Sequence, residues 1–121
     1  MTIREAIALA DEMAPNAISE ALKIRWLSEL DGRVEQEILS PDTGSTFAGY
    51  GNDVQTDTVL KIPYPYDGIY PTWLKMHIDR LNGEMQKYND GVILCNETLE
   101  AYRRTLTRTA AAAAPRKVKY F

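Results

Sequence analysis

The chain has 121 residues, of which 45% are hydrophobic and 26% are charged, which is the size and composition of one globular domain with its own core. Residues 1–109 carry eleven basic and seventeen acidic side chains, a net charge of −6, whereas residues 110–121 carry three basic side chains and no acidic one. An acidic body repels phosphate, which argues against a nucleic-acid-binding protein. No apolar run is long enough to cross a bilayer, no signal peptide is visible, and one His with one Cys argues against a zinc site and excludes an internal disulfide.

The first predicted helix begins after Thr2 and ends before Pro15. Thr2 and Glu5 have the spacing of a capping box, in which each side chain accepts a hydrogen bond from the backbone of the other. Apolar residues then recur at helical spacing, at Ile3, Ala6, Ile7 and Ala10. Pro15 disfavours the helical conformation in the residue before it, so the helix is expected to stop there.

The second predicted helix runs from about Glu20 to Leu39, with Ser19 as its N-cap. Its apolar stripe has spacings of 3, 4 and 4 and consists of Leu27, Leu30, Val34 and Ile38. Gly32 lies inside this helix and costs about 1 kcal/mol relative to alanine.

Residues 40–60 are predicted to form a long loop, because turn-forming residues dominate and no helical period is present. Alternating residues from Thr58 to Ile62 predict a short strand that stops at Pro63. A single short strand needs a partner, and the candidates are the stretch 47–50 or another chain.

Two further helices are predicted after this loop. Asp67 is expected to cap a helix that runs to about Tyr88 and has Pro71 in its opening turn, where no helical hydrogen bond is lost. Residues 89–91, Asn-Asp-Gly, are interpreted as a tight break, followed by a helix from Val92 to about Leu106. Two apolar stripes joined by so short a connection predict an αα-hairpin.

In that hairpin, we expect two residues of the third helix, Ile78 and Leu81, to face Leu99 and Tyr102 of the fourth. The elements together predict an all-α fold, a small four-helix bundle with a C-terminal αα-hairpin, in one domain spanning residues 1–109. Residues 110–121 are expected to form a flexible basic tail.

Three motifs were weighed as sites of chemistry. Asp42-Thr43-Gly44 matches the nucleophile loop of aspartic proteases, but that enzyme needs a mostly β fold and two such loops, so a surface turn is the better interpretation. His77 has no second histidine near it in sequence and is interpreted as a packing or solvated residue. Cys95 lies on an apolar stripe and is interpreted as a small core residue. No catalytic, cofactor or metal site is predicted, and the chain is expected not to be an enzyme.

The densest aromatic patch surrounds the start of the third helix and consists of Tyr64, Tyr66, Tyr70 and Trp73. Aromatic anchors serve both cores and interfaces, so this patch either binds a partner protein or fixes the helix entry onto the bundle. A cellular helical adaptor that binds a partner through this patch is therefore one functional hypothesis.

Two segments, taken together, carry a resemblance. They are Lys23–Gly32, with the sequence KIRWLSELDG, and Leu60–Asp67, with the sequence LKIPYPYD. Further matching positions follow at Tyr70, Trp73, Leu74, Ile78, Asp79, 82–84 and 87–89. Over roughly residues 3–108 the chain resembles the head–tail connector, or adaptor, proteins of long-tailed bacteriophages and prophages.

The resemblance implies a structural protein of the virion neck, made in the cytoplasm of the host bacterium. Such proteins form a ring, usually of twelve subunits, beneath the portal at the capsid vertex and extend the channel through which DNA passes. The partners of this chain would then be the portal protein and the next neck or tail-completion protein. The resemblance implies no sequence-specific DNA binding, no cofactor and no contact with a membrane.

The resemblance also implies where partners bind, namely residues 40–60 and the C-terminal end. The candidate partner-binding residues in the tail are Arg116, Lys117, Lys119, Tyr120 and Phe121. Because the acidic body makes neighbouring subunits repel one another, the free protein is expected to be a monomer or a weak oligomer, with its ring templated by the portal.

Overall fold

The computed structural model describes residues 1–40 and 46–113, and this part of the chain is all-α, as predicted. Its four α-helices are α1 (Ile3–Met13), α2 (Glu20–Val34), α3 (Ile69–Leu81) and α4 (Met85–Ala113). Two short helical turns accompany them, the π-helical turn η1 (Glu35–Leu39) and the 3-10 turn η2 (Tyr66–Gly68). None of the described helices is long and apolar enough to span a membrane.

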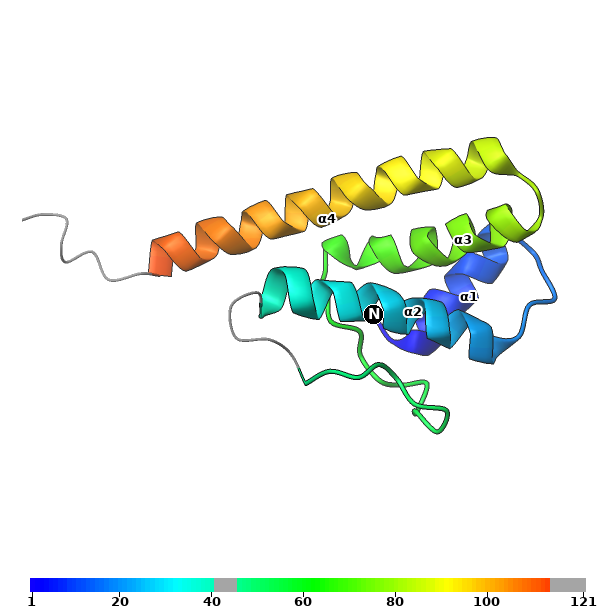
Figure 1. Cartoon of the computed structure of the whole chain (residues 1–121), viewed down its shortest axis with the longest axis horizontal. Helices are drawn as coiled ribbons and strands as arrows, with labels where there is room; N and C mark the ends of the chain where they lie inside the picture. Colours follow the sequence, from blue (N-terminus) through cyan, green and yellow to red (C-terminus); the bar gives the residue numbers. More distant parts are fainter. Residues whose placement is uncertain (41–45, 114–121) are drawn as a thin grey trace, which may run out of the picture.

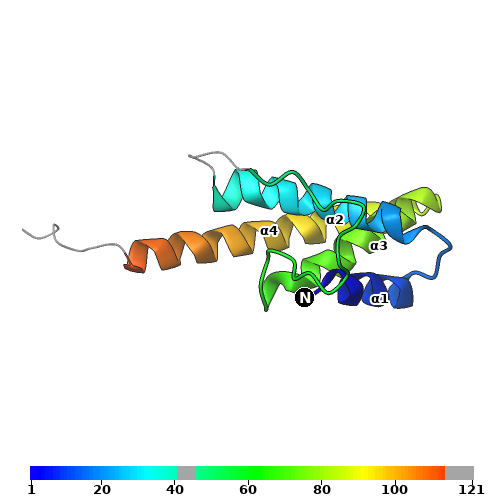
Figure 2. The same ribbon diagram turned by 90° about the horizontal axis from the view of Figure 1, so that it is seen from below.

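Helix α3 lies in the middle of the molecule. It packs against α4 on one side and against α1 and α2 on the other (Figure 1). The C-terminal part of α4 extends beyond the other helices in both views (Figures 1 and 2). The largest fully buried side chains come from α1, α2, α3 and the connection before α3, and they include Ile3, Leu27, Leu30, Ile62, Ile69, Tyr70, Leu74 and Ile78.

The helix starts predicted for α1 and α2 are confirmed. The backbone N–H of Glu5 donates to Thr2 Oγ1 at 3.1 Å and that of Thr2 donates to Glu5 Oε1 at 2.9 Å, so the capping box is complete. Ser19 Oγ accepts from the backbone N–H of Leu22 at 3.2 Å. Each cap satisfies backbone donors that the first helical turn leaves without a partner.

Helix α2 continues through Gly32 as predicted, but its last turn changes geometry. Residues 35–39 form the π-helical turn η1, closed by a hydrogen bond from the N–H of Ser40 to the carbonyl of Glu35 at 2.9 Å. The side chain of Glu35 also forms an ion pair with Lys61 at 3.3 Å. The end of the second helix is thereby tied to the connection that leads to α3.

The predicted break between the last two helices is wrong. The chain turns at residues 82–84, where Gly83 adopts φ +77°, a conformation that other residues rarely adopt. Asn89, Asp90 and Gly91 are instead inside α4. At Gly91, helices α3 and α4 approach so closely that a Cβ atom would lie 2.9 Å from Cβ of Met76. This close approach explains the glycine.

This change of register overturns the expected pairing across the hairpin. Ile78 is buried, but it lies near the turn, and in an antiparallel hairpin the residues around 99–102 lie several turns away from it. Tyr102 packs instead against Tyr66, with their ring centroids 5.6 Å apart. Leu81 is 51% exposed at the end of α3 and is not part of the core.

We therefore expect Leu81→Ala to change the free energy of unfolding by no more than about 0.5 kcal/mol, the range of surface substitutions. Urea denaturation followed by circular dichroism measures this change. A loss of about 2 kcal/mol or more would show that Leu81 is buried and that the hairpin has the register predicted from the sequence.

The predicted strand at 58–62 is reduced to one isolated antiparallel bridge between Val59 and Thr2. The N–H of Leu60 donates to the carbonyl of Met1 at 2.9 Å, and the N–H of Ile3 donates to the carbonyl of Thr58 at 3.1 Å. The partner of this segment is therefore the N-terminal residues of the same chain, and not residues 47–50. This pairing was missed because it joins segments far apart in the sequence.

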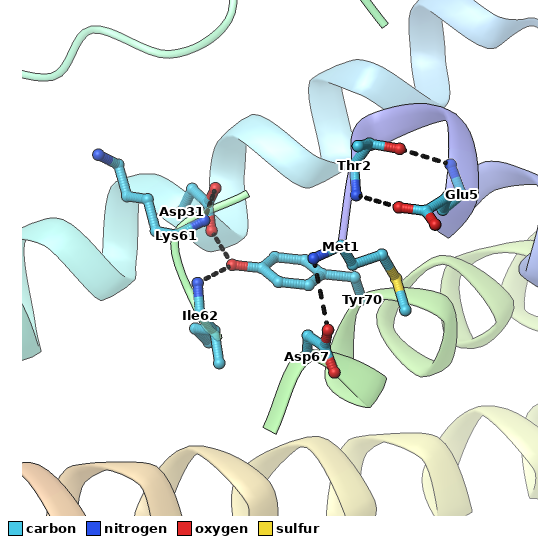
Figure 3. Close-up of polar contacts among 8 residues, drawn as sticks. All are labelled: Met1, Thr2, Glu5, Asp31, Lys61, Ile62, Asp67 and Tyr70. Atoms are coloured by element: carbon cyan, nitrogen blue, oxygen red, sulfur yellow. Dashed lines mark hydrogen bonds and ion pairs between the residues drawn. The ribbon is translucent and has the colours of Figure 1, made fainter. Parts of the chain in front are cut away.

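Asp67 does not cap α3, contrary to the prediction. It lies in η2, and its carboxylate pairs with the amino group of Met1 at 3.4 Å (Figure 3), while Gly68 occupies the N-cap position without a side-chain hydrogen bond. Pro71 is in the first turn of α3, as predicted. Helix α4 continues to Ala113, beyond the expected domain boundary at residue 109.

Candidate functional site

A buried carboxylate, Asp31, accepts three hydrogen bonds from groups far from it in the sequence. It lies on the core side of α2 and has no exposed surface. The sequence contains a signal for this burial, because Asp31 is four residues after Leu27 and three before Val34 and so shares the apolar face of the helix. We did not predict its role from the sequence.

Three donors from two other parts of the chain converge on Asp31. The hydroxyl of Tyr70, on α3, donates to Oδ1 at 2.5 Å, and the hydroxyl of Tyr50, in the connection, donates to Oδ2. The backbone N–H of Lys61 also donates to Oδ2, at 3.2 Å. Tyr70 completes the network by accepting a hydrogen bond from the N–H of Ile62 at 2.7 Å (Figure 3). We call Asp31, Tyr50, Lys61, Ile62 and Tyr70 the Asp31 network.

Burial sets the electrostatics of this network. It raises the pKa of Asp31 above its ordinary value, while the hydrogen bonds from Tyr50 and Tyr70 and from the Lys61 backbone oppose that rise. Burial and the adjacent carboxylate also raise the pKa of both tyrosines, so their hydroxyls stay protonated and act as donors. Both carboxylate oxygens are occupied by donors of the chain itself, so the network positions segments and leaves Asp31 no free atom for chemistry.

A cleft of about 830 Å³ opens next to this network, between α2 and residues 47–52. One wall is the outer face of α2, including Ile24, Ser28 and Gly32. The other wall is formed by residues 47–52, including Phe47 and Tyr50. A Cβ atom at Gly32 would meet no atom within 4 Å, so no packing within the described chain requires glycine there.

The four aromatic residues proposed as a binding patch do not form one exposed surface. Tyr70 is fully buried in the Asp31 network. Tyr66 hydrogen-bonds Thr105 at 2.7 Å, and the indole N–H of Trp73 donates to the carbonyl of Trp26 at 2.7 Å. Only Tyr64 among the four is widely exposed, at 85%. The rings at 66, 70 and 73 therefore attach the start of α3 to α2 and α4, which was the alternative interpretation.

Cys95 is a core residue, as interpreted from the sequence. It is 2% exposed on the face of α4 that meets α3, and burial raises the pKa of its thiol to about 12. A thiol with so high a pKa is almost entirely protonated at neutral pH and is a poor nucleophile.

His77 is a packing residue held between two tryptophans. Its ring stacks on Trp26 at a centroid distance of 4.8 Å and meets Trp73 edge-on at 4.8 Å. Its Nε2 atom is buried and has no hydrogen-bond partner among the described residues. Burial, with a smaller contribution from Arg80, lowers the pKa of His77 to about 4.

This lowered pKa predicts a pH-dependent loss of stability. The unfolded chain binds a proton at residue 77 near pH 6.5, and the folded chain binds it only near pH 4, so the free energy of unfolding falls as the pH is lowered between these values. His77→Phe keeps an aromatic ring between the tryptophans and removes this titration. Urea denaturation at pH 7, 6, 5 and 4 should show a shallower decline for the variant, and identical profiles would contradict the prediction.

Apolar side chains remain uncovered along α4. Met85, Ile93 and Leu94 are 50%, 58% and 54% exposed, and Leu81 of α3 lies beside the turn that leads into the helix. Helix α4 packs against α3 and η2. Within residues 1–40 and 46–113, these side chains of α4 therefore stay largely uncovered.

Asp42, Thr43 and Gly44 lie outside the described residues, as do the tail residues from Arg116 to Phe121. The described fold is helical, which does not match the mostly β fold that the aspartic-protease hypothesis requires. Within residues 1–40 and 46–113, no group of three or more His, Cys, Asp or Glu side chains is placed to hold a metal ion.

Comparisons with protein-family models, with curated proteins and with solved structures gave no match to this chain.

Proposed function

We propose that this chain is a structural subunit of a bacteriophage neck, a head–tail connector protein that forms a ring beneath the portal. The observation that carries the proposal is the Asp31 network. It joins the two segments on which the resemblance to connector proteins rests, because Asp31 comes from the segment 23–32 while Lys61 comes from the segment 60–67 and Tyr70 follows it. Residues that resemble the family at separate places in the sequence thus belong to one structural unit.

The exposed apolar residues of α4 support an assembling subunit. Met85, Ile93 and Leu94 are half or more exposed in the isolated chain. Covering the exposed half of each side chain in a ring contributes about 1 kcal/mol, roughly half the value for burying a fully exposed side chain. Because α4 extends beyond the other helices (Figure 1), it also offers a surface to a neighbouring subunit without any change in the bundle.

The partners in this proposal are the portal protein and the next neck or tail-completion protein. Residues 40–60 and 110–121 would face them, and the three cations of the tail would add an electrostatic contribution that salt screens. The acidic body would line or surround the channel without binding DNA sequence-specifically.

We expect a portal gene near the gene for this chain, and co-expression of the two proteins tests the proposal. We expect the two proteins to co-purify, and electron microscopy should show a ring of this chain on one face of the portal. Deletion of residues 115–121 should preserve the fold and weaken portal binding, most visibly at low salt.

Failure of the full-length chain to bind the portal, together with capture of an unrelated cellular protein, would favour the adaptor hypothesis instead. If the truncated chain binds the portal as tightly as the full chain, the ring proposal stands and the role of the tail is wrong.

A further inference from the structure

The connection between α2 and α3 is attached to the helices in two different ways. Its second half is fixed by backbone hydrogen bonds to the start of the chain, including those from Arg4 to Thr56 at 2.9 Å and from Leu60 to Met1 at 2.9 Å. Leu60 and Ile62 are also buried, at 3% and 0% exposure. This half is part of the core.

In the described part of the chain, the hydrogen bonds that join the first half, residues 46–53, to α2 come from Tyr50. The N–H of Tyr50 donates to Ser28 Oγ at 2.7 Å, and its hydroxyl donates to Asp31. Phe47 packs edge-on against Tyr50, with ring centroids 5.2 Å apart. The ammonium group of Lys61 lies over the Phe47 ring, 4.5 Å from its centroid. The hydrogen bond from Val54 to Gly51, at 3.1 Å, closes a turn within the connection and adds no attachment to a helix.

From this difference we infer that residues 46–53 form a strap across the outer face of α2 that opens as a unit while the helices stay folded. The two hydrogen bonds of Tyr50 to α2 hold the strap closed. Release of Tyr50 does not leave the buried carboxylate without partners, since Asp31 keeps the Tyr70 hydroxyl and the Lys61 N–H. The freed groups of Tyr50 and Ser28 reach water and form hydrogen bonds there. Opening therefore costs much less than unfolding the core.

Opening would uncover the wall of the cleft on α2. That wall includes Ser28 and Gly32 and the exposed part of Ile24, whose other side packs against the core. Opening of the strap would therefore expose this wall of α2 to solvent. This inference is independent of the proposed neck function, because it concerns the free chain alone.

Amide hydrogen exchange followed by nuclear magnetic resonance tests the strap on the full chain. In the wild type, the amide of Tyr50 should exchange faster than those of Leu60 and Leu74, because it exchanges by local opening. Tyr50→Phe removes the hydroxyl bond to Asp31 and keeps the amide, so exchange at residue 50 should become about tenfold faster or more, with Leu60 and Leu74 changed far less.

Two further variants make the test specific. Ser28→Ala removes the acceptor of the Tyr50 amide and should also accelerate exchange at residue 50. Tyr64→Phe removes a hydroxyl from an 85% exposed ring in the same connection and should change nothing. Exchange of residues 50, 60 and 74 at one common rate in the wild type would overturn the inference. So would an unchanged rate at residue 50 in Tyr50→Phe, or an equal acceleration of all three amides.

Discussion

Replacement of Asp31 by alanine is expected to destabilise the chain by about 3–5 kcal/mol, the largest effect of any polar substitution in the described fold. The substitution leaves the buried hydroxyl of Tyr70 and the partly buried N–H of Lys61 without their acceptor, and it removes the partner of the Tyr50 hydroxyl. Urea denaturation followed by circular dichroism measures the loss.

Two variants show whether the loss comes from the hydrogen bonds. Asp31→Asn keeps one carbonyl acceptor at nearly the same volume and should lose less than Asp31→Ala. Asp57→Ala removes an exposed carboxylate from the same connection and should stay within about 0.5 kcal/mol of the wild type. A loss below about 1 kcal/mol in Asp31→Ala would contradict the burial and the connectivity of this carboxylate.

Gly91→Ala is expected to destabilise the chain by about 1–3 kcal/mol, although alanine has the higher helix propensity. The added Cβ atom would lie 2.9 Å from Cβ and 3.2 Å from Cγ of Met76, so α3 and α4 must move apart or Met76 must leave its position. Thermal and urea denaturation both report this change.

Gly32→Ala is the matched control, because Gly32 also lies inside an α-helix but a Cβ atom there meets nothing within 4 Å. It should stabilise the chain by up to about 1 kcal/mol, the difference in helix propensity. Opposite signs for the two substitutions would confirm the hairpin register. Stabilisation by both would show that the helices do not approach closely at residue 91.

Local signals in the sequence were sufficient for much of the fold. Thr2 with Glu5, and Ser19, marked the helix starts correctly because capping depends on residues three positions apart. The apolar stripe predicted for the second helix was correct at Leu27, Leu30 and Val34, which are all buried. Its last member, Ile38, is only half-buried and lies in η1.

Long-range contacts explain what the sequence did not reveal. Asn89-Asp90-Gly91 has the composition of a turn, yet Gly91 serves the close approach of α4 to Met76, which is a property of two helices together. The partners of Asp31 lie 19, 30 and 39 residues away in the sequence. A helical period could place Asp31 on the apolar face of α2 but could not supply its donors.

The central proposal, a virion structural subunit, is tested most directly by quantitative mass spectrometry of phage particles purified from cells that carry the gene for this chain. We expect peptides of this chain in tailed particles, at a copy number equal to that of the portal protein and far below that of the capsid protein. Complete absence from purified particles, with the protein found only in the lysed cells, would contradict it.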